Sequence, residues 1–199
     1  MNPALDLNPQ SLFRDSWDRR ASVDPAEKKW NGWRLMPFGR RHAASIVRWV
    51  KGEQQLRWLA PSTTPPLTAE KIVGWEKPGG QAFVLQKGHG GQPLGYGEVN
   101  PMRRGSDRLW LGHVVVRPDQ RGRGVGSVLL QALLSEAFDR RDATHVALIV
   151  FPDNVAALRC YQRAGFRLMG EEFHQFKGQG SLHRLLRLEM TRPATLCSP

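Results

Sequence analysis

The most constraining feature of this sequence is an apolar helix followed by an apolar strand in the second half of the chain. Residues 125–138 are apolar on almost every side, which predicts a helix packed between a sheet and further cover. Residues 145–151 form a continuous apolar run, which is typical of a strand buried on both faces and paired in parallel. A strand predicted over residues 109–116 precedes the helix. The three segments therefore predict a parallel strand–helix–strand unit inside an α/β sheet.

The flanking segments extend this unit to a mixed sheet with helices. Asn154 is a suitable N-cap for a second helix after the buried strand, and Gly165 is a suitable left-handed stop. The other expected elements are a strand at 33–36, helices at 42–50 and about 68–77, a hairpin of 82–85 and 94–99, and two last strands at 166–176 and 182–190. The predicted order is β-α-α-β-β-β-α-β-α-β-β, antiparallel early and parallel across the long helix.

The chain length fits one folded domain, because domains commonly hold about 100–200 residues. Residues 1–31 carry three prolines and charges of both signs, so they are expected to form an N-terminal extension. The domain itself is expected over residues 32–192, with a C-terminal tail over 193–199.

The charge is strongly positive, since 29 Lys and Arg residues against 18 Asp and Glu residues give a net charge of +11. Such a surface favours an anionic partner, and a phosphate-bearing cofactor, a nucleic acid and an acidic protein all stay open. The two cysteines, Cys160 and Cys197, are too few for a disulfide framework, and no Cys or His spacing predicts a metal site. No run approaches the ~20 apolar residues of a membrane span, and no leader pattern opens the chain, which predicts a cytoplasmic protein.

The segment with the clearest chemistry is the glycine-rich turn at residues 121–126, between the strand at 109–116 and the long helix. Alternating glycines let backbone N–H groups point at phosphate oxygens, and the helix N-terminus adds a partial positive charge. Two familiar phosphate loops do not fit. Ser127 stands where a dinucleotide fingerprint needs its third glycine, and no Gly-Lys-Ser/Thr follows.

The turn, preceded by Val114-Val115-Val116-Arg117-Pro118 and followed by Asn154-x-x-Ala157-x-x-x-Tyr161-x-x-x-Gly165-Phe166, resembles the GNAT superfamily of acyl-CoA-dependent N-acyltransferases. The resemblance runs from about residue 33 to 190. It implies that acetyl-CoA is the cofactor, with its pyrophosphate on the backbone of the turn and its pantetheine arm along the preceding strand. The cofactor-binding residues so implied are Val114, Val115, Val116, Arg121, Gly122, Arg123, Gly124, Val125, Gly126, Ser127, Asn154 and Ala157.

The resemblance also implies catalytic roles. Tyr161 matches the general acid that protonates the departing thiolate. Some relatives place a glutamate, acting as general base, where this chain has Trp110. Glu98 on the neighbouring strand is therefore the first candidate for the base, and His113 is the second.

The predicted function is transfer of an acetyl group from acetyl-CoA to a primary amine by direct attack in a ternary complex. The acceptor stays open between a small molecule and a peptide or protein amine, and a homodimer also stays open. Selectivity is expected from the loop between the first two helices, near Trp49, Trp58 and Trp75, and from a hairpin at 177–181. The acids of this region, Glu53, Glu70 and Glu76, are scattered, so no acidic cluster predicts a polycationic acceptor. The alternative is a basic protein of the same fold that acts on an RNA-borne aminoacyl group or only binds nucleic acid.

Overall fold

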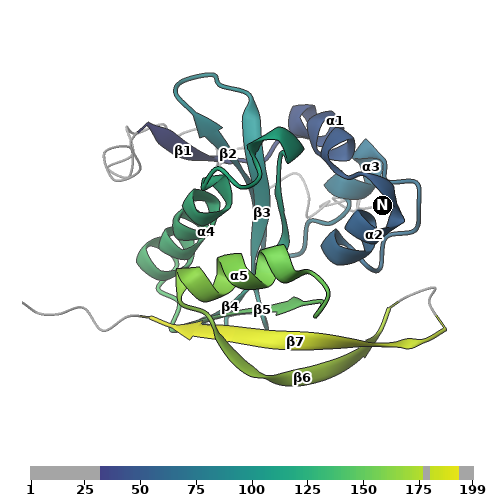
Figure 1. Cartoon of the computed structure of the whole chain (residues 1–199). Helices are drawn as coiled ribbons and strands as arrows, with labels where there is room; N and C mark the ends of the chain where they lie inside the picture. Colours follow the sequence, from purple (N-terminus) through teal and green to yellow (C-terminus); the bar gives the residue numbers. More distant parts are fainter. Residues whose placement is uncertain (1–31, 177–179, 193–199) are drawn as a thin grey trace, which may run out of the picture.

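The computed structural model describes residues 32–176 and 180–192, and a seven-stranded mixed sheet is its central element (Figure 1). The strands are β1 (Trp33–Pro37), β2 (Gln81–Lys87), β3 (Pro93–Pro101), β4 (Arg108–Val116), β5 (His145–Val150), β6 (Arg167–Gln175) and β7 (Leu182–Thr191). The helices are α1 (Arg40–Trp49), α2 (Gly52–Leu59), α3 (Ala69–Val73), α4 (Val125–Ser135) and α5 (Val155–Ala164). A single 3₁₀ turn, Pro118–Gln120, follows β4, and a π-helical turn, Glu136–Arg140, follows α4.

The strands lie in the order β1-β2-β3-β4-β5-β7-β6. Neighbours from β1 to β4 are antiparallel, β4 and β5 are parallel, and β5, β7 and β6 are antiparallel again. Among the described strands the only parallel pair is the one joined by α4, because a crossover helix is what allows two strands to run in the same direction. The mixed sheet, antiparallel early and parallel across the long helix, is the one the sequence predicts, while the position of β7 between β5 and β6 was not predicted.

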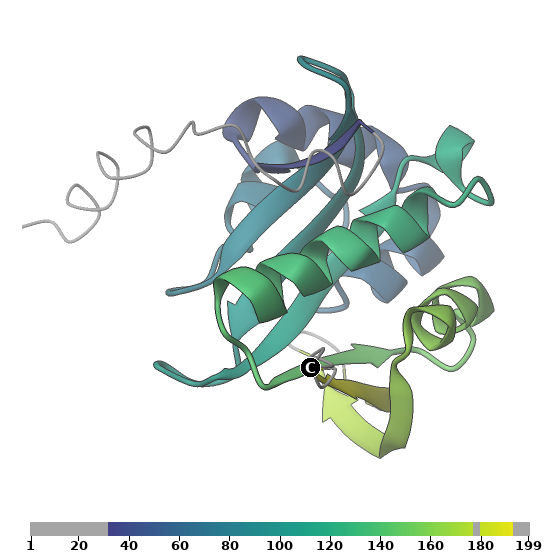
Figure 2. The same cartoon turned by 90° about the vertical axis from the view of Figure 1, so that its left-hand side faces the viewer.

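The two faces of the sheet have separate apolar cores. On one face, which we call the α1–α3 face, those helices pack on Val84 and Tyr96. On the opposite face, the α4–α5 face, α4 lies across β1, β3 and β4 and also contacts α5 (Figures 1 and 2). Leu129 and Leu133 of α4 are fully buried. The helix α4 is covered by the sheet on one side and by α5 on another, which explains why it is apolar almost all round.

The α/β fold with a mixed sheet is thus confirmed, and one helix differs from the expectation. The segment after Val50 was expected to be loop up to the prolines at 61–66, but Gly52–Leu59 forms α2, so three helices separate β1 from β2. Its apolar residues Leu56 and Leu59 are spaced by one turn and are buried. That short periodicity was the available signal, and the proximity of the prolines obscured it.

The predicted extension (1–31) and tail (193–199) lie outside the described residues, as do residues 177–179 of the predicted hairpin. The first strand begins at Trp33 and the last ends at Thr191, while the domain boundaries themselves stay a prediction. In the described part of the chain, no helix combines the length and the apolarity needed to cross a bilayer.

Candidate active site

After β4 the chain passes through the 3₁₀ turn, and the glycine-rich turn at residues 121–126 then leads into α4, whose first residue is Val125. Gly122 and Gly124 have φ of +73° and +82°, a left-handed conformation that favours glycine, and Gly124 is the N-cap of α4. A Cβ added to either glycine would meet no atom within 4 Å. The loop is therefore bare on its outer side, which is where a ligand could approach the backbone.

The backbone N–H groups of residues 122–126 have no acceptor within the described chain. The next amides, of Ser127 and Val128, both bond the Gly124 carbonyl at 3.0 and 3.2 Å. A run of unpaired donors at the start of an eleven-residue helix is a site for an anion, because the helix dipole adds to the donors. This geometry fits a diphosphate.

The two arginines of the loop differ in their contacts. The Arg121 guanidinium donates to the carbonyls of Val116 and Trp49, at 3.1 and 3.3 Å, and so ties the loop to the end of α1. Arg123 is exposed and has no such partner in the described residues. Of the two side chains, Arg123 is the one available to an anion.

Next to the loop, β4 and β5 part. They pair only over residues 108–110 and 145–147, and the edges beyond face each other without pairing. Val114 and Val116 pack on the core of the α4–α5 face, while Val115 packs on that of the α1–α3 face. Their backbone groups along the gap are left to bond an extended ligand, as an added strand would.

On the β5 side of the gap, Asn154 caps α5 by accepting a hydrogen bond from the Ala157 N–H at 3.3 Å. Asp153, beside it, accepts hydrogen bonds from two side chains of α2: Arg57, and the Trp58 indole at 3.0 Å. Because α2 contacts β4, this Asp153 bridge joins elements that lie on either side of the gap. Trp58, which the sequence analysis placed near the selectivity loop, therefore ties α2 to the β5 side of the gap.

Tyr161 lies on α5, on the α4–α5 face. Its ring is buried and meets Phe166 edge-on, with 5.9 Å between ring centroids. Among the described residues the Tyr161 hydroxyl has no hydrogen-bond partner, and the residue is 9% exposed. Burial, and to a smaller extent the neighbouring Cys160, raises the pKa of Tyr161, so the phenol keeps its proton at neutral pH.

Glu98 and His113, the two candidate bases, are in direct contact. His113 Nδ1 lies 2.9 Å from Glu98 Oε1 and must donate, since an ionised carboxylate only accepts. The Tyr96 hydroxyl donates to the same oxygen at 2.6 Å, and Asn100 Nδ2 donates to Oε2 at 3.1 Å. Glu98 is 1% exposed, so it cannot meet an acceptor directly, whereas His113 is partly exposed and its Nε2 is free of partners in the described chain.

These three hydrogen bonds set the charge of Glu98. Burial alone would raise its pKa, but donation from His113, Tyr96 and Asn100 outweighs burial and leaves the Glu98 pKa below its ordinary value. The carboxylate is therefore ionised and holds the imidazole with Nε2 outward.

His113 owes its position to a β-bulge. Tyr96 and Glu98 face Val115 and Gly112, so β4 contains one residue more than β3 over this stretch, and His113 has φ of +48°. The Trp75 ring stacks on the imidazole, with 4.2 Å between ring centroids and an interplanar angle of 18°, and donates its indole N–H to Thr63 at 2.9 Å.

The sequence analysis named Glu98, His113 and Trp75 separately, but it did not predict the bulge that brings them together or the hydrogen bonds of Tyr96 and Asn100 to Glu98. Alignment of the β3–β4 hairpin was the signal that could have found them.

The acid and base candidates thus occupy opposite faces of the sheet. Tyr161 belongs to the core of the α4–α5 face, and Glu98 and His113 lie beside Tyr96 on the α1–α3 face. A model of the acetyltransferase (GNAT) family matches residues 43–166 of this arrangement.

The chain belongs to the acetyltransferase (GNAT) family.

Relatives of this GNAT chain acetylate amines, judging by their names. The aminoglycoside N(6')-acetyltransferase type 1 of Klebsiella pneumoniae is 30% identical over 143 residues, which is 63% of this chain and 64% of the relative. The chain thus spans less than two thirds of that relative's length. The spermine/spermidine N(1)-acetyltransferase of Bacillus subtilis (strain 168) is 33% identical over 64 residues, 32% of this chain and 42% of the relative.

Solved structures agree on the fold. The spermidine N-acetyltransferase of Vibrio cholerae, in complex with CoA and spermine, superposes with a TM-score of 0.67 at 15% identity, over 81% of this chain and 96% of that one. An aminoglycoside acetyltransferase in complex with coenzyme A gives a TM-score of 0.60 at 18% identity, over 80% of this chain and 95% of that one. The expected GNAT resemblance is confirmed, and acetyl-CoA is the donor that GNAT enzymes use.

The residues of this GNAT chain fit that donor. The unpaired amides of residues 122–126, the bare glycines and the unpaired strand edges are complementary to a diphosphate joined to an amide-containing arm. In the described residues, no group of three or more His, Cys, Asp or Glu side chains could hold a metal ion.

Proposed function

We propose that this protein is an acetyl-CoA-dependent N-acetyltransferase that acts on a primary amine by direct attack in a ternary complex. The observation that carries the proposal is the gap between β4 and β5, with bare backbone amides at its α4 end and the Glu98–His113 pair on the α1–α3 face. Acetyl-CoA supplies the acetyl group as a thioester, whose thiolate is a fair leaving group because thiols have a pKa near ~8.5.

His113 removes a proton from the acceptor ammonium through Nε2, and Glu98 keeps the ring in the required tautomer. The freed amine nitrogen forms a bond to the acetyl carbon as the carbon–sulfur bond breaks. Tyr161 gives its proton to the departing sulfur and regains one from the acylated nitrogen, so a single proton is released to water overall. Glu98, the first candidate for the base from sequence, thus becomes the residue that orients the base.

The residues implied by the resemblance divide by role. The loop residues 121–126 and Ser127 would hold the diphosphate, Val114, Val115 and Val116 the pantetheine arm, and Asn154 and Ala157 the β5 side of the arm. Nothing here favours the nucleic-acid alternative, and a homodimer stays a prediction.

The test is release of CoA from acetyl-CoA with a panel of primary amines. His113→Gln keeps a donor and acceptor of similar size and should lower kcat by about 10²–10⁴-fold at neutral pH while the Kd for acetyl-CoA is unchanged. Raising the pH should recover part of the loss, since the free amine then forms without a base. Failure of the wild-type protein to acetylate any amine, or an unaffected kcat in His113→Gln, would refute the proposal.

A further inference from the structure

The α1–α3 face carries three carboxylates on its described strands, and each is already neutralised within the protein. Trp110 shares this face with Glu98, because its register partner Asn100 bonds Glu98. Residues paired across neighbouring strands lie on the same face of a sheet. Trp110 pairs with Ala147 of β5, and Ala147 pairs with Glu189 of β7, so Glu189 lies on the α1–α3 face. On β6, Glu172 pairs with Leu185 of β7, which is four residues from Glu189 and therefore on the same face.

The two outer carboxylates belong to an alternating chain of charges. Glu189 bonds Arg187 at 2.7 Å and lies 3.4 Å from Arg108, while Arg187 also bonds Glu172 at 2.8 Å. The second oxygen of Glu172 lies 2.7 Å from His174. Two guanidinium groups thus balance two carboxylates.

A second ammonium group on an acceptor would find no uncommitted carboxylate on the described strands of this face. It would have to displace Arg187 or an imidazole from a half-buried ion pair, and breaking such a pair leaves a charge without a partner. Glu76, beside Trp75 in sequence, is exposed, so water and salt screen its charge. The face is therefore poorly suited to a polycation.

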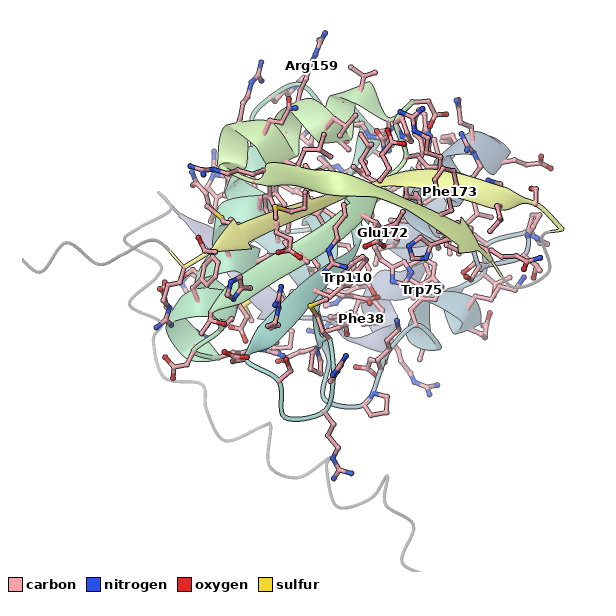
Figure 3. The ribbon with its side chains drawn as sticks, turned by 90° about the horizontal axis from the view of Figure 1, so that it is seen from below. Phe38, Trp75, Trp110, Arg159, Glu172 and Phe173 are labelled. Atoms are coloured by element: carbon pink, nitrogen blue, oxygen red, sulfur yellow. The ribbon has the colours of Figure 1, made fainter. Side chains whose placement is uncertain are left out.

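Aromatic rings occupy the part of this face nearest to His113. Trp75 stacks on the imidazole, and the Phe38 ring lies 5.3 Å from that of Tyr96. Phe38 and Trp110 are half-buried, so both keep apolar surface open to a ligand. In Figure 3, which looks at the molecule from below, the labelled Phe38, Trp75, Trp110 and Glu172 lie in the middle of the view and Arg159 of α5 lies at its edge.

Gly112 lies beside the Trp110 ring on this face. A Cβ on Gly112 would lie 3.4 to 3.6 Å from Asn100, Glu98 and the Trp110 indole nitrogen. Gly112 has no side chain, so none of its own atoms cover the Trp110 indole. An acceptor's apolar body buried against that ring would gain about 25 cal/mol per Å² of apolar surface.

We propose that the acceptor is a primary amine with a single positive charge on an aromatic or alkyl body, and that Trp110 is the residue that selects it. The amine would meet His113 and the apolar body would lie on Trp110. This inference rests on the proposed N-acetyltransferase function, and it separates the chain from relatives named for polyamines and aminoglycosides.

The first experiment compares kcat/KM for phenethylamine, phenylalanine, spermidine and kanamycin at fixed acetyl-CoA. Phenethylamine should exceed each of the others by about tenfold or more, because unpaired charges are rejected more strongly than methylenes. Spermidine or kanamycin as the better substrate would overturn the inference and leave the proposed function standing. A preference for phenylalanine would also overturn it, since its carboxylate would then have found a partner among the arginines.

The second experiment measures amine binding without turnover, by calorimetry on the CoA-saturated protein. Phenethylamine should bind more tightly than spermidine. If it does so while no amine is acetylated, the proposed function fails and the inference about the acceptor stands; tighter binding of spermidine refutes the inference itself.

The third experiment assigns the selectivity. Trp110→Leu should raise KM for phenethylamine about tenfold with kcat unchanged, which is the signature of lost binding rather than of a damaged reaction centre. Trp33→Leu is the matched control, because Trp33 lies on the edge strand β1 and packs under Lys87, with the ammonium 5.6 Å from the ring centre. Equal KM values for the Trp110 variant and the wild type would remove Trp110 from the site.

Discussion

At the α4 end of the gap between β4 and β5, the groups offered to a ligand are backbone amides of a single loop, residues 122–126. On the α1–α3 face the group offered is a side chain, the imidazole of His113, which Glu98 of β3 and Trp75 after α3 hold in place. The first half depends on glycine and a helix start, which are properties of consecutive residues. The second depends on strand register and on one inserted residue. Backbone amides can bind the common donor whatever side chains the loop carries. The residues around His113, by contrast, can change from one relative to another and so change the acceptor.

Tyr161→Phe tests this contrast most severely, because it removes one oxygen from an otherwise buried ring. The phenyl ring keeps its contact with Phe166, so folding and acetyl-CoA affinity should be unchanged, while kcat should fall by roughly 10²–10⁴-fold. Steady-state kinetics with the best amine and calorimetry with CoA measure the two quantities. An undiminished kcat would leave Tyr161 a core residue only.

Gly124→Asp tests the backbone half. An aspartate at φ of +82° is strained and places a negative charge beside the unpaired amides, so CoA affinity should fall by about 10²–10³-fold. Gly105→Asp is the matched control, because Gly105 has φ of +73° and open space around it but lies in the turn between β3 and β4, at the end of β4 remote from the loop. Equal CoA affinity in the two folded variants, by calorimetry, would contradict a diphosphate site at Gly124.

Glu98→Gln gives the smallest effect and reports on the side-chain half through stability. The folded pKa of Glu98 is depressed, so its contribution to stability is present above the unfolded pKa of about 4.3 and is lost as the pH falls through the folded value. At pH 7 the variant should lose about 1–3 kcal/mol of unfolding free energy. At pH 3 the difference between variant and wild type should shrink. Denaturant titrations at the two pH values measure it, and a difference independent of pH would mean that Glu98 is not ionised in the folded protein.

The same division explains how much the sequence could reveal. The turn at 121–126, the helix start at Asn154 and the left-handed Gly165 could be predicted because each is encoded by adjacent residues, and the structure has both helices where they were expected. The contact of His113 with Glu98 could not, because they are fifteen positions apart and a bulge shifts the register between them. The partners of Asp153 were equally hidden, since Arg57 and Trp58 belong to a helix that the prolines after it obscured.

The parting of β4 and β5 also means that this sheet has edges in its middle as well as at β1 and β6. Unpaired strand edges invite pairing with other chains, and most proteins cover them. Here the Asp153 bridge lies near one end of the gap. Along the rest of the gap, the unpaired backbone groups of β4 and β5 can be satisfied by a ligand that forms hydrogen bonds as a strand does. Such a ligand stabilises the folded protein, because it binds the folded state only. At a free concentration of a hundred times its Kd it would add about 2.7 kcal/mol to the free energy of unfolding. The supply of donor in the cell would then govern how long the chain persists as well as how fast it works.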